Sequence, residues 1–250
     1  MTSFPNHGCV CIVGALLLAS LACHGHAQDQ KKPAQQWQVR GIQSGLSDPL
    51  LSVKLLALQE MQCFSRIDGI SPLQIAPFLT ASDHDLVSAA ATTLGQMQTK
   101  EQAPALMKLF NDPSRSIGVR GTAAYALGYI KANEQAPKLL QFLKDPSSDP
   151  SLRSDVAYAL GEMQAKDQIP ELAELLKDSH NQVRSAAAVA LGQMQAKEQI
   201  PELAQLLIDP DFDVRRAAAS ALGKMQAKEH ASEIAKLLND PMVVVLSRCT

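Results

Sequence analysis

Residues 163–192 read MQAKDQIPELAELLKDSHNQVRSAAAVALG, and residues 194–223 read MQAKEQIPELAQLLIDPDFDVRRAAASALG. About 21 of the 30 aligned positions are identical, which is typical of a duplicated structural unit. The dipeptide Leu-Gly marks the same place in more divergent copies, and its spacing, counted from Leu58-Gln59, is 36, 33, 33, 31 and 31 residues. The sequence therefore predicts about six full repeats, with Pro241 to Thr250 opening a partial seventh.

Each repeat reads as a pair of short helices. The first, such as Pro170 to Lys177, has apolar residues at the helical spacing i, i+3, i+4, namely Leu172, Leu175 and Leu176. The second runs from about Val183 to Met194 and carries an apolar face of Val183, Ala187, Ala190, Leu191 and Met194. Two such helices cannot bury their apolar faces alone, so the repeats are predicted to stack into an all-α solenoid.

Gly192 lies near the end of the second helix and recurs in the other repeats. A glycine in a helix costs about 1 kcal/mol relative to alanine. Its repetition therefore indicates either close backbone contact with a neighbouring helix or a helix terminus.

The pattern D-x-x-x-x-V-R-x-A-A-x-A-L-G, seen from Asp178 and again from Asp209, resembles the short HEAT repeats of the phycobilisome lyase type. The resemblance covers the chain from about Gln36 and is strong from Leu86 onward. It implies a right-handed superhelical solenoid of HEAT-like helix pairs. In that family the first helices form the convex side and the second helices line the concave side.

Composition argues against two classes of partner. The chain of 250 residues has 23 Lys and Arg against 25 Asp and Glu, a net charge of -2. This balance provides no long-range field that attracts nucleic acid or anionic lipid. We therefore expect the partner to be another protein, with no nucleic acid bound.

The first residues differ from the rest of the chain. Val10 to Ala22 is an apolar run of signal-peptide length, too short to span a bilayer comfortably. Small residues precede a cleavage point after Ala27, although the leading MTSFPNH lacks Lys and Arg. The expected organisation is a signal peptide at 1–27, a polar linker at 28–36 and a HEAT-like repeat domain at 37–250.

Export to the periplasm or the exterior follows from that leader. Two alternatives stay open: a lipoprotein anchored to the membrane through Cys23, and an uncleaved anchor. Outside the leader only Cys63 and Cys249 remain, and neither forms a CxxC motif. Because several helix layers would separate them, we expect no intramolecular disulfide between these two.

The family includes enzyme-linked members. Deoxyhypusine hydroxylase, built on similar repeats, binds iron through His-Glu dipeptides at the start of its second helices. The matching positions here are Gly121-Thr122, Ser154-Asp155, Ser185-Ala186 and Arg216-Ala217, and the chain contains no His-Glu. We therefore expect no metal, no cofactor and no catalytic residues, and a protein that is not an enzyme. The alternative is a lyase-like subunit with bilin or metal chemistry, which a secretory leader would separate from cytoplasmic pigment assembly.

An Asp and an Arg recur in step along the repeats. They are Asp112 with Arg120, Asp145 with Arg153, Asp178 with Arg184, and Asp209 with Arg215. Equal numbers of both signs at fixed spacing favour a structural ladder, in which each Arg bonds the Asp of its own or a neighbouring turn. A basic ladder that recognises an acidic partner is the alternative.

The second helices also carry all three tyrosines of the chain on the face opposite the core, within two adjacent repeats. Tyrosine combines rigid apolar area with a polar tip and is enriched at interfaces. We therefore predict a partner-binding patch on the concave face, made of Tyr125, Tyr129, Tyr158 and Glu162. Simple stacking of Tyr125 on Tyr158 is the competing interpretation.

Overall fold

The computed structural model of the protein describes residues 33–64 and 67–232. The expected signal peptide, most of the linker and the partial seventh repeat lie outside these ranges. The residues described are helices joined by turns, without a β-strand among them, as an all-α fold requires. They divide into two units, one ending at Ala126 and the other beginning at Leu127.

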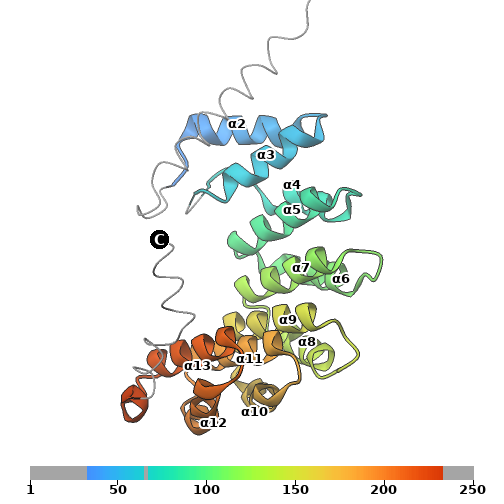
Figure 1. Ribbon diagram of the computed structural model, residues 1–250. Helices are drawn as coiled ribbons and strands as arrows, with labels where there is room; N and C mark the ends of the chain where they lie inside the picture. The colour runs from blue at the N-terminus through green and yellow to red at the C-terminus, as the bar shows by residue number, and fades with distance from the viewer. Residues whose placement is uncertain (1–32, 65–66, 233–250) are drawn as a thin grey trace, which may run out of the picture. The chain divides into compact units, whose positions relative to one another are not determined.

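The described residues of the first unit form five complete α-helices and the start of a sixth (Figure 1). They are α2 (Gln36–Ser47), α3 (Leu51–Met61), α4 (Pro72–Ile75), α5 (His84–Gln96), α6 (Ala103–Asn111) and α7 (Ile117–Tyr129), which crosses the boundary. Short 3₁₀ helices, η1 (Ala76–Thr80) and η2 (Lys100–Gln102), precede or extend the first helices of the repeats. Helix α3 packs on α2 and α5, so consecutive repeats share one core.

The second unit continues the same alternation. Its α-helices are α8 (Ala136–Leu143), α9 (Pro150–Met163), α10 (Ile169–Glu174), α11 (Asn181–Gln193), α12 (Ile200–Gln205) and α13 (Phe212–Lys224). Its 3₁₀ helices are η3 (Asn133–Gln135), η4 (Lys166–Gln168), η5 (Leu175–Lys177), η6 (Lys197–Gln199), η7 (Leu206–Ile208) and η8 (Lys228–His230).

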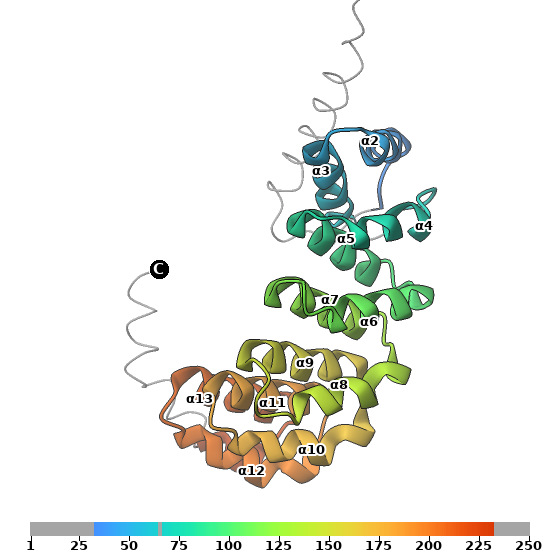
Figure 2. The ribbon, with the colours of Figure 1, turned by 90° about the vertical axis from the view of Figure 1, so that its right-hand side faces the viewer.

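Two layers make up this unit. The second helices α9, α11 and α13 lie side by side in one layer, and α8, α10 and α12 pack against them from the other (Figures 1 and 2). Proline in the first turn suits α8, α10 and α12, because the N–H that proline lacks is not needed there.

The predicted apolar faces are confirmed as the core. Leu172, Leu175 and Leu176 of one first helix are buried. The five predicted residues of the following second helix are at most 1% exposed: Val183, Ala187, Ala190, Leu191 and Met194. The first helix ends differently from the prediction, since α10 is α-helical only to Glu174 and tightens into η5 over Leu175–Lys177.

The alanines of the second helices allow close contact at glycine. A Cβ placed on Gly95 would lie 3.0 Å from the Cα of Ala126, and one on Gly192 would lie 2.8 Å from the Cα of Ala221. Gly192 is also the last residue but one of α11. Both interpretations of the recurrent glycine therefore hold, and the close backbone contact is what excludes a side chain.

The expected absence of a bond between Cys63 and Cys249 stays a prediction. Cys63, in the turn after α3, is disulfide-bonded. That bond alone does not decide the pairing that the sequence was expected to exclude, between Cys63 and Cys249. All four other cysteines of the chain lie outside the described residues.

Candidate functional site

The predicted patch is built on the exposed edge of the second helices. In the second unit, Tyr129 ends α7 and is 48% exposed, while Tyr158 on α9 is half-buried. Gly128 brings these helices together, because a Cβ there would lie 3.1 Å from the Cα of Ala159 and 3.2 Å from the Cβ of Glu162. Tyr129, Tyr158 and Glu162 are thus carried by two helices in close contact.

Glu162 is held in place from the next repeat. Its Oε1 accepts a hydrogen bond of 2.6 Å from Nε2 of Gln193 on α11. Gln193 occupies in its own repeat the place that Glu162 occupies in the preceding one, so the pair links adjacent second helices. The carboxylate can still reach a ligand, since Glu162 is only partly buried.

Tyr125 belongs to the unit that ends at Ala126. It is half-buried on α7, one helical turn before Tyr129. Tyr125 and Tyr158 therefore belong to different units, and stacking between the two stays a prediction.

The Asp and Arg residues of the second unit join consecutive repeats. Nη2 of Arg153 on α9 lies 2.6 Å from Oδ2 of Asp178, in the turn before α11. Nε of Arg153 donates to the main-chain oxygen of Leu143, the last residue of α8, at 2.9 Å. One buried guanidinium, 3% exposed, therefore ties a first helix, its second helix and the next repeat together.

The next repeat uses the same design. Arg184 on α11 makes two bonds to the carboxylate of Asp209, Nε to Oδ2 at 2.9 Å and Nη2 to Oδ1 at 3.0 Å. Its Nη1 also donates to the main-chain oxygen of Asp178 at 2.8 Å. A bidentate pair of this kind fixes geometry as well as charge. Little of either arginine is left to attract an acidic partner.

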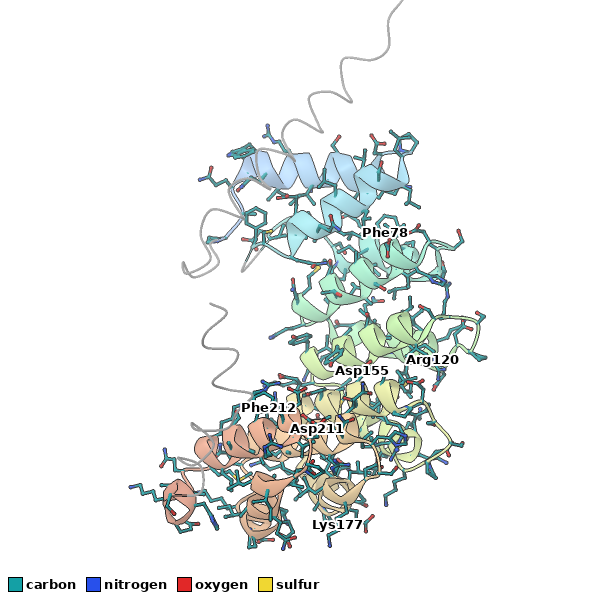
Figure 3. The ribbon with its side chains drawn as sticks, in the orientation of Figure 1. Phe78, Arg120, Asp155, Lys177, Asp211 and Phe212 are labelled. Carbon is teal, nitrogen blue, oxygen red and sulfur yellow. The ribbon has the colours of Figure 1, made fainter. Side chains whose placement is uncertain are left out.

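The other members of the ladder have local partners. Oδ1 of Asp112 accepts from the N–H and hydroxyl of Ser114, and Asp145 binds Ser147 in the same way. Nε of Arg120 donates to the main-chain oxygen of Phe110 at 2.8 Å. Nη1 of Arg215 donates to the main-chain oxygen of Asp209 at 2.8 Å, and its guanidinium lies 5.7 Å from the ring centre of Phe212, at the start of α13 (Figure 3).

Two kinds of feature are absent from the described part of the chain. Within residues 33–64 and 67–232, no three His, Cys, Asp or Glu side chains come together as metal ligands would. None of the helices over the same residues has the length and apolar character that crossing a bilayer requires.

Comparison with known proteins identifies the family. The model of HEAT repeats matches residues 73–149, 114–188, 137–223 and 169–247, which together exceed half of the chain. The chain is a HEAT-repeat protein. No curated protein sequence matches it significantly.

Solved structures share the fold of this HEAT-repeat protein at low identity. A chain in the complex of CpcE and CpcF of phycocyanin lyase from Nostoc sp. is 21% identical, with a TM-score of 0.58, over 83% of this chain and 84% of that one. The E. coli protein YibA is 20% identical, with a TM-score of 0.53, over 85% of this chain and 82% of that one. The sequence-based resemblance to the lyase type is thereby confirmed for the fold.

Sequence reasoning missed a second set of links between these HEAT repeats. Five residues that lie one or two positions after second helices adopt a left-handed conformation with φ between 52° and 58°: Gln98, Lys131, Gln164, Gln195 and Gln226. In the second unit, Nε2 of Gln164 donates to the main-chain oxygen of Gln193, and Nε2 of Gln195 donates to that of Lys224. The recurrent Met-Gln dipeptide was the available signal.

The Arg153 pair also affects the charge of Asp178. Burial raises the pKa of Asp178, but the N–H of His180 and the Arg153 guanidinium outweigh it and hold the pKa below its usual value of 3.8. A lowered folded-state pKa means that the ionised carboxylate adds stability above pH 3.8, and that this contribution is lost as pH falls below it.

Replacing Asp178 by asparagine should therefore have a pH-dependent effect. We expect the loss in free energy of unfolding to be largest near about pH 6 and to shrink by about pH 3, where the wild-type carboxylate is itself being protonated. Urea denaturation of both proteins at the two pH values checks this. A loss that stays constant, or grows on acidification, would show that the charge of Asp178 does not stabilise the fold.

Proposed function

We propose that this HEAT-repeat protein is a scaffold or accessory subunit that is exported from the cytoplasm and binds another protein on the face of its second helices. The observation that carries the proposal is Tyr129, a large side chain left 48% exposed at the end of a helix that contacts, through Gly128, the helix of Tyr158 and Glu162. The core of stacked HEAT repeats lies between the helix layers. Aromatic area that is exposed outside this core is therefore available for a partner.

Further support comes from the form of this face. HEAT solenoids offer extended surfaces on which several repeats contact one partner. A structure with the same fold is that of a complex between two proteins, CpcE and CpcF. Export is supported by the apolar run Val10 to Ala22, with the membrane lipoprotein as its alternative.

Affinity capture from the source cell tests the proposal. The full chain should retain a specific protein, and the double variant Tyr125→Ala, Tyr158→Ala should lose at least about tenfold in affinity for it, as truncation of interface tyrosines does. Ile208→Ala is the matched control, because Ile208 is an apolar residue 87% exposed on η7, in the layer of the first helices. It should bind as wild type does.

Three results would decide against the tyrosine face. Equal affinity of wild type and the folded double variant, with circular dichroism as the check on folding, would remove the patch. A loss in Ile208→Ala alone would move the site to the first helices. Failure to retain any protein specifically would favour a structural spacer.

A lyase-like subunit is the second candidate, and its support is the similarity to the fold of the phycocyanin lyase structure. We prefer the proposal that the protein is not an enzyme, because the iron-binding His-Glu dipeptides of the enzyme-linked family are replaced in this sequence. Bilin transfer or metal-dependent activity in the purified protein would reverse that choice.

A further inference from the structure

A single row of side chains crosses the second helices of the second unit at their C-terminal ends. It consists of the ninth residue after each recurrent Arg, at or next to the last residue of its helix: Tyr129 of α7, Glu162 of α9, Gln193 of α11 and Lys224 of α13. Tyr129 and Lys224 are exposed, and Glu162 and Gln193 are partly buried. We call this set the helix-end row.

The junctions between repeats hold the helix-end row in place. The main-chain oxygens of Gln193 and Lys224 accept hydrogen bonds from Nε2 of Gln164 and of Gln195, at 2.9 and 3.1 Å. The helices that carry the row also touch directly through glycine and alanine. Because the backbone under the row is fixed from one repeat to the next, its side chains are presented at a constant spacing, which lowers the ordering cost of binding.

The charges of the helix-end row are separated along it. Glu162 is negative and Lys224 is positive, and the two lie two second helices apart with neutral Gln193 between them. Gln193 is already engaged within the row, because its Nε2 donates to Oε1 of Glu162 at 2.6 Å. A complementary segment therefore carries a positive charge at α9 and a negative charge at α13.

The spacing of the helices selects the conformation of such a segment. Helices in contact have axes about 8–10 Å apart, so two helix spacings separate Glu162 and Lys224 by about 16–20 Å. A polyproline II helix has about three residues per turn and rises about 3.1 Å per residue, so one turn spans one helix spacing and six residues span two. Its side chains at every third residue would meet successive second helices.

An α-helical segment fits the helix-end row less well. Recognition of a helix uses an apolar groove that takes several apolar anchors, whereas this row has one aromatic residue and three polar ones. Proline-rich segments in the polyproline II conformation instead dock on exposed aromatic side chains, and Tyr129 is 48% exposed at one end of the row.

We propose that the helix-end row binds a proline-rich, extended segment of the partner protein that runs across the second helices. A basic side chain of the segment pairs with Glu162, and an acidic side chain about six residues further on pairs with Lys224. A proline one turn before the basic residue lies on the ring of Tyr129. The inference rests on the proposed protein-binding function and names the chemistry of the bound segment.

Synthetic peptides test the charges and their spacing. The probe is acetyl-PPPRPPPPPEP-amide, in which the glutamate lies two polyproline II turns after the arginine. At low ionic strength the full chain should bind it with a Kd on the order of 0.1 mM, measured by isothermal titration calorimetry. The control peptide acetyl-PPPRPPPEPPP-amide has the same composition, but its two charges lie on different sides of the polyproline II helix. It should bind about fivefold more weakly, as expected for the loss of one surface ion pair.

Variants of the row test the residues. Lys224→Glu should weaken binding of the probe about fivefold or more, and should bind acetyl-PPPRPPPPPRP-amide more tightly than wild type does, because the second arginine then meets a carboxylate. Tyr129→Ala should weaken binding of the probe about tenfold, as truncation of an interface tyrosine does. Both side chains are exposed, so circular dichroism should show an unchanged fold.

Lys177→Glu is the matched control for the charge reversal. Lys177 is an exposed lysine at the end of η5, in the layer of the first helices (Figure 3), and its reversal makes the same change in net charge. It should bind the probe as wild type does. The proposal would be overturned by absence of binding to wild type, by equal binding of the two peptides of the same composition, or by equal effects of Lys224→Glu and Lys177→Glu.

The captured partner distinguishes this inference from the function on which it rests. If Lys224→Glu retains the partner as wild type does, while Tyr125→Ala, Tyr158→Ala loses it, the helix-end row is not the anchor and the binding function stands. If the peptide binds but no protein is captured, the row binds proline-rich segments and the proposed function fails. Loss of the partner in Lys224→Glu but not in Lys177→Glu, together with binding of the peptide, supports both.

Discussion

Replacing Arg153 by methionine should lower the free energy of unfolding by about 3 kcal/mol or more. Arg153 is 3% exposed and lies 2.6 Å from a carboxylate of Asp178 that is itself only 10% exposed. Methionine keeps much of the side-chain volume but leaves the buried carboxylate without its counter-charge, which is the most damaging way to break such a pair. The main-chain oxygen of Leu143 loses its donor at the same time.

The chain offers a matched control for this change. Arg216 pairs with Asp213 at 3.1 Å, but the two side chains are 68% and 66% exposed. Surface pairs of this kind contribute about 0–1 kcal/mol, so Arg216→Met should remain close to wild type. Urea denaturation followed by circular dichroism measures both variants. Equal, small effects would mean that Arg153 and Asp178 do not hold the repeats together.

Arg153→Lys separates charge from geometry. Lysine keeps the positive charge but has one nitrogen, which cannot serve Asp178 and the main-chain oxygen of Leu143 as the guanidinium does. Its stability should therefore fall between wild type and Arg153→Met. A lysine variant as stable as wild type would assign the whole effect to charge.

The helices and their buried faces could be predicted because the repeat is regular. The periodicity of Leu172, Leu175 and Leu176 fixes one face of a first helix, and stacking is then required to bury it. The sequence alone does not reveal which neighbour each polar group meets. The pairing of Arg153 with an Asp of the next repeat depends on how two repeats are placed, a tertiary property that spacing within one repeat leaves open.

The glutamine links between repeats were missed because they depend on residues that depart from their usual backbone conformation. A glutamine at φ of about 57°, as at Gln164, contradicts the preference of that conformation for glycine, and is offset by the bond that its amide donates across the repeat junction.

Replacing glycine by alanine at two equivalent positions should have opposite effects on stability. At Gly192, the new Cβ would lie 2.8 Å from both the Cα and the Cβ of Ala221, closer than real Cβ contacts come, so the backbones of α11 and α13 would have to separate. Overpacking costs about 1–3 kcal/mol, against a gain of about 1 kcal/mol in helix propensity. We expect Gly192→Ala to be less stable than wild type.

Gly223 is the last residue but one of α13, as Gly192 is of α11, and both follow the sequence Ala-Leu. Among the described residues no atom comes within 4 Å of a Cβ at Gly223, so Gly223→Ala keeps only the gain in helix propensity, up to about 1 kcal/mol. The two variants should therefore differ by about 2 kcal/mol in free energy of unfolding, measured by urea denaturation. If they change stability equally, contact with the next repeat does not explain the recurrent glycine, and helix termination does. A difference of the expected sign would show that Gly192 is kept without a side chain because Ala221 of the following repeat packs directly on it.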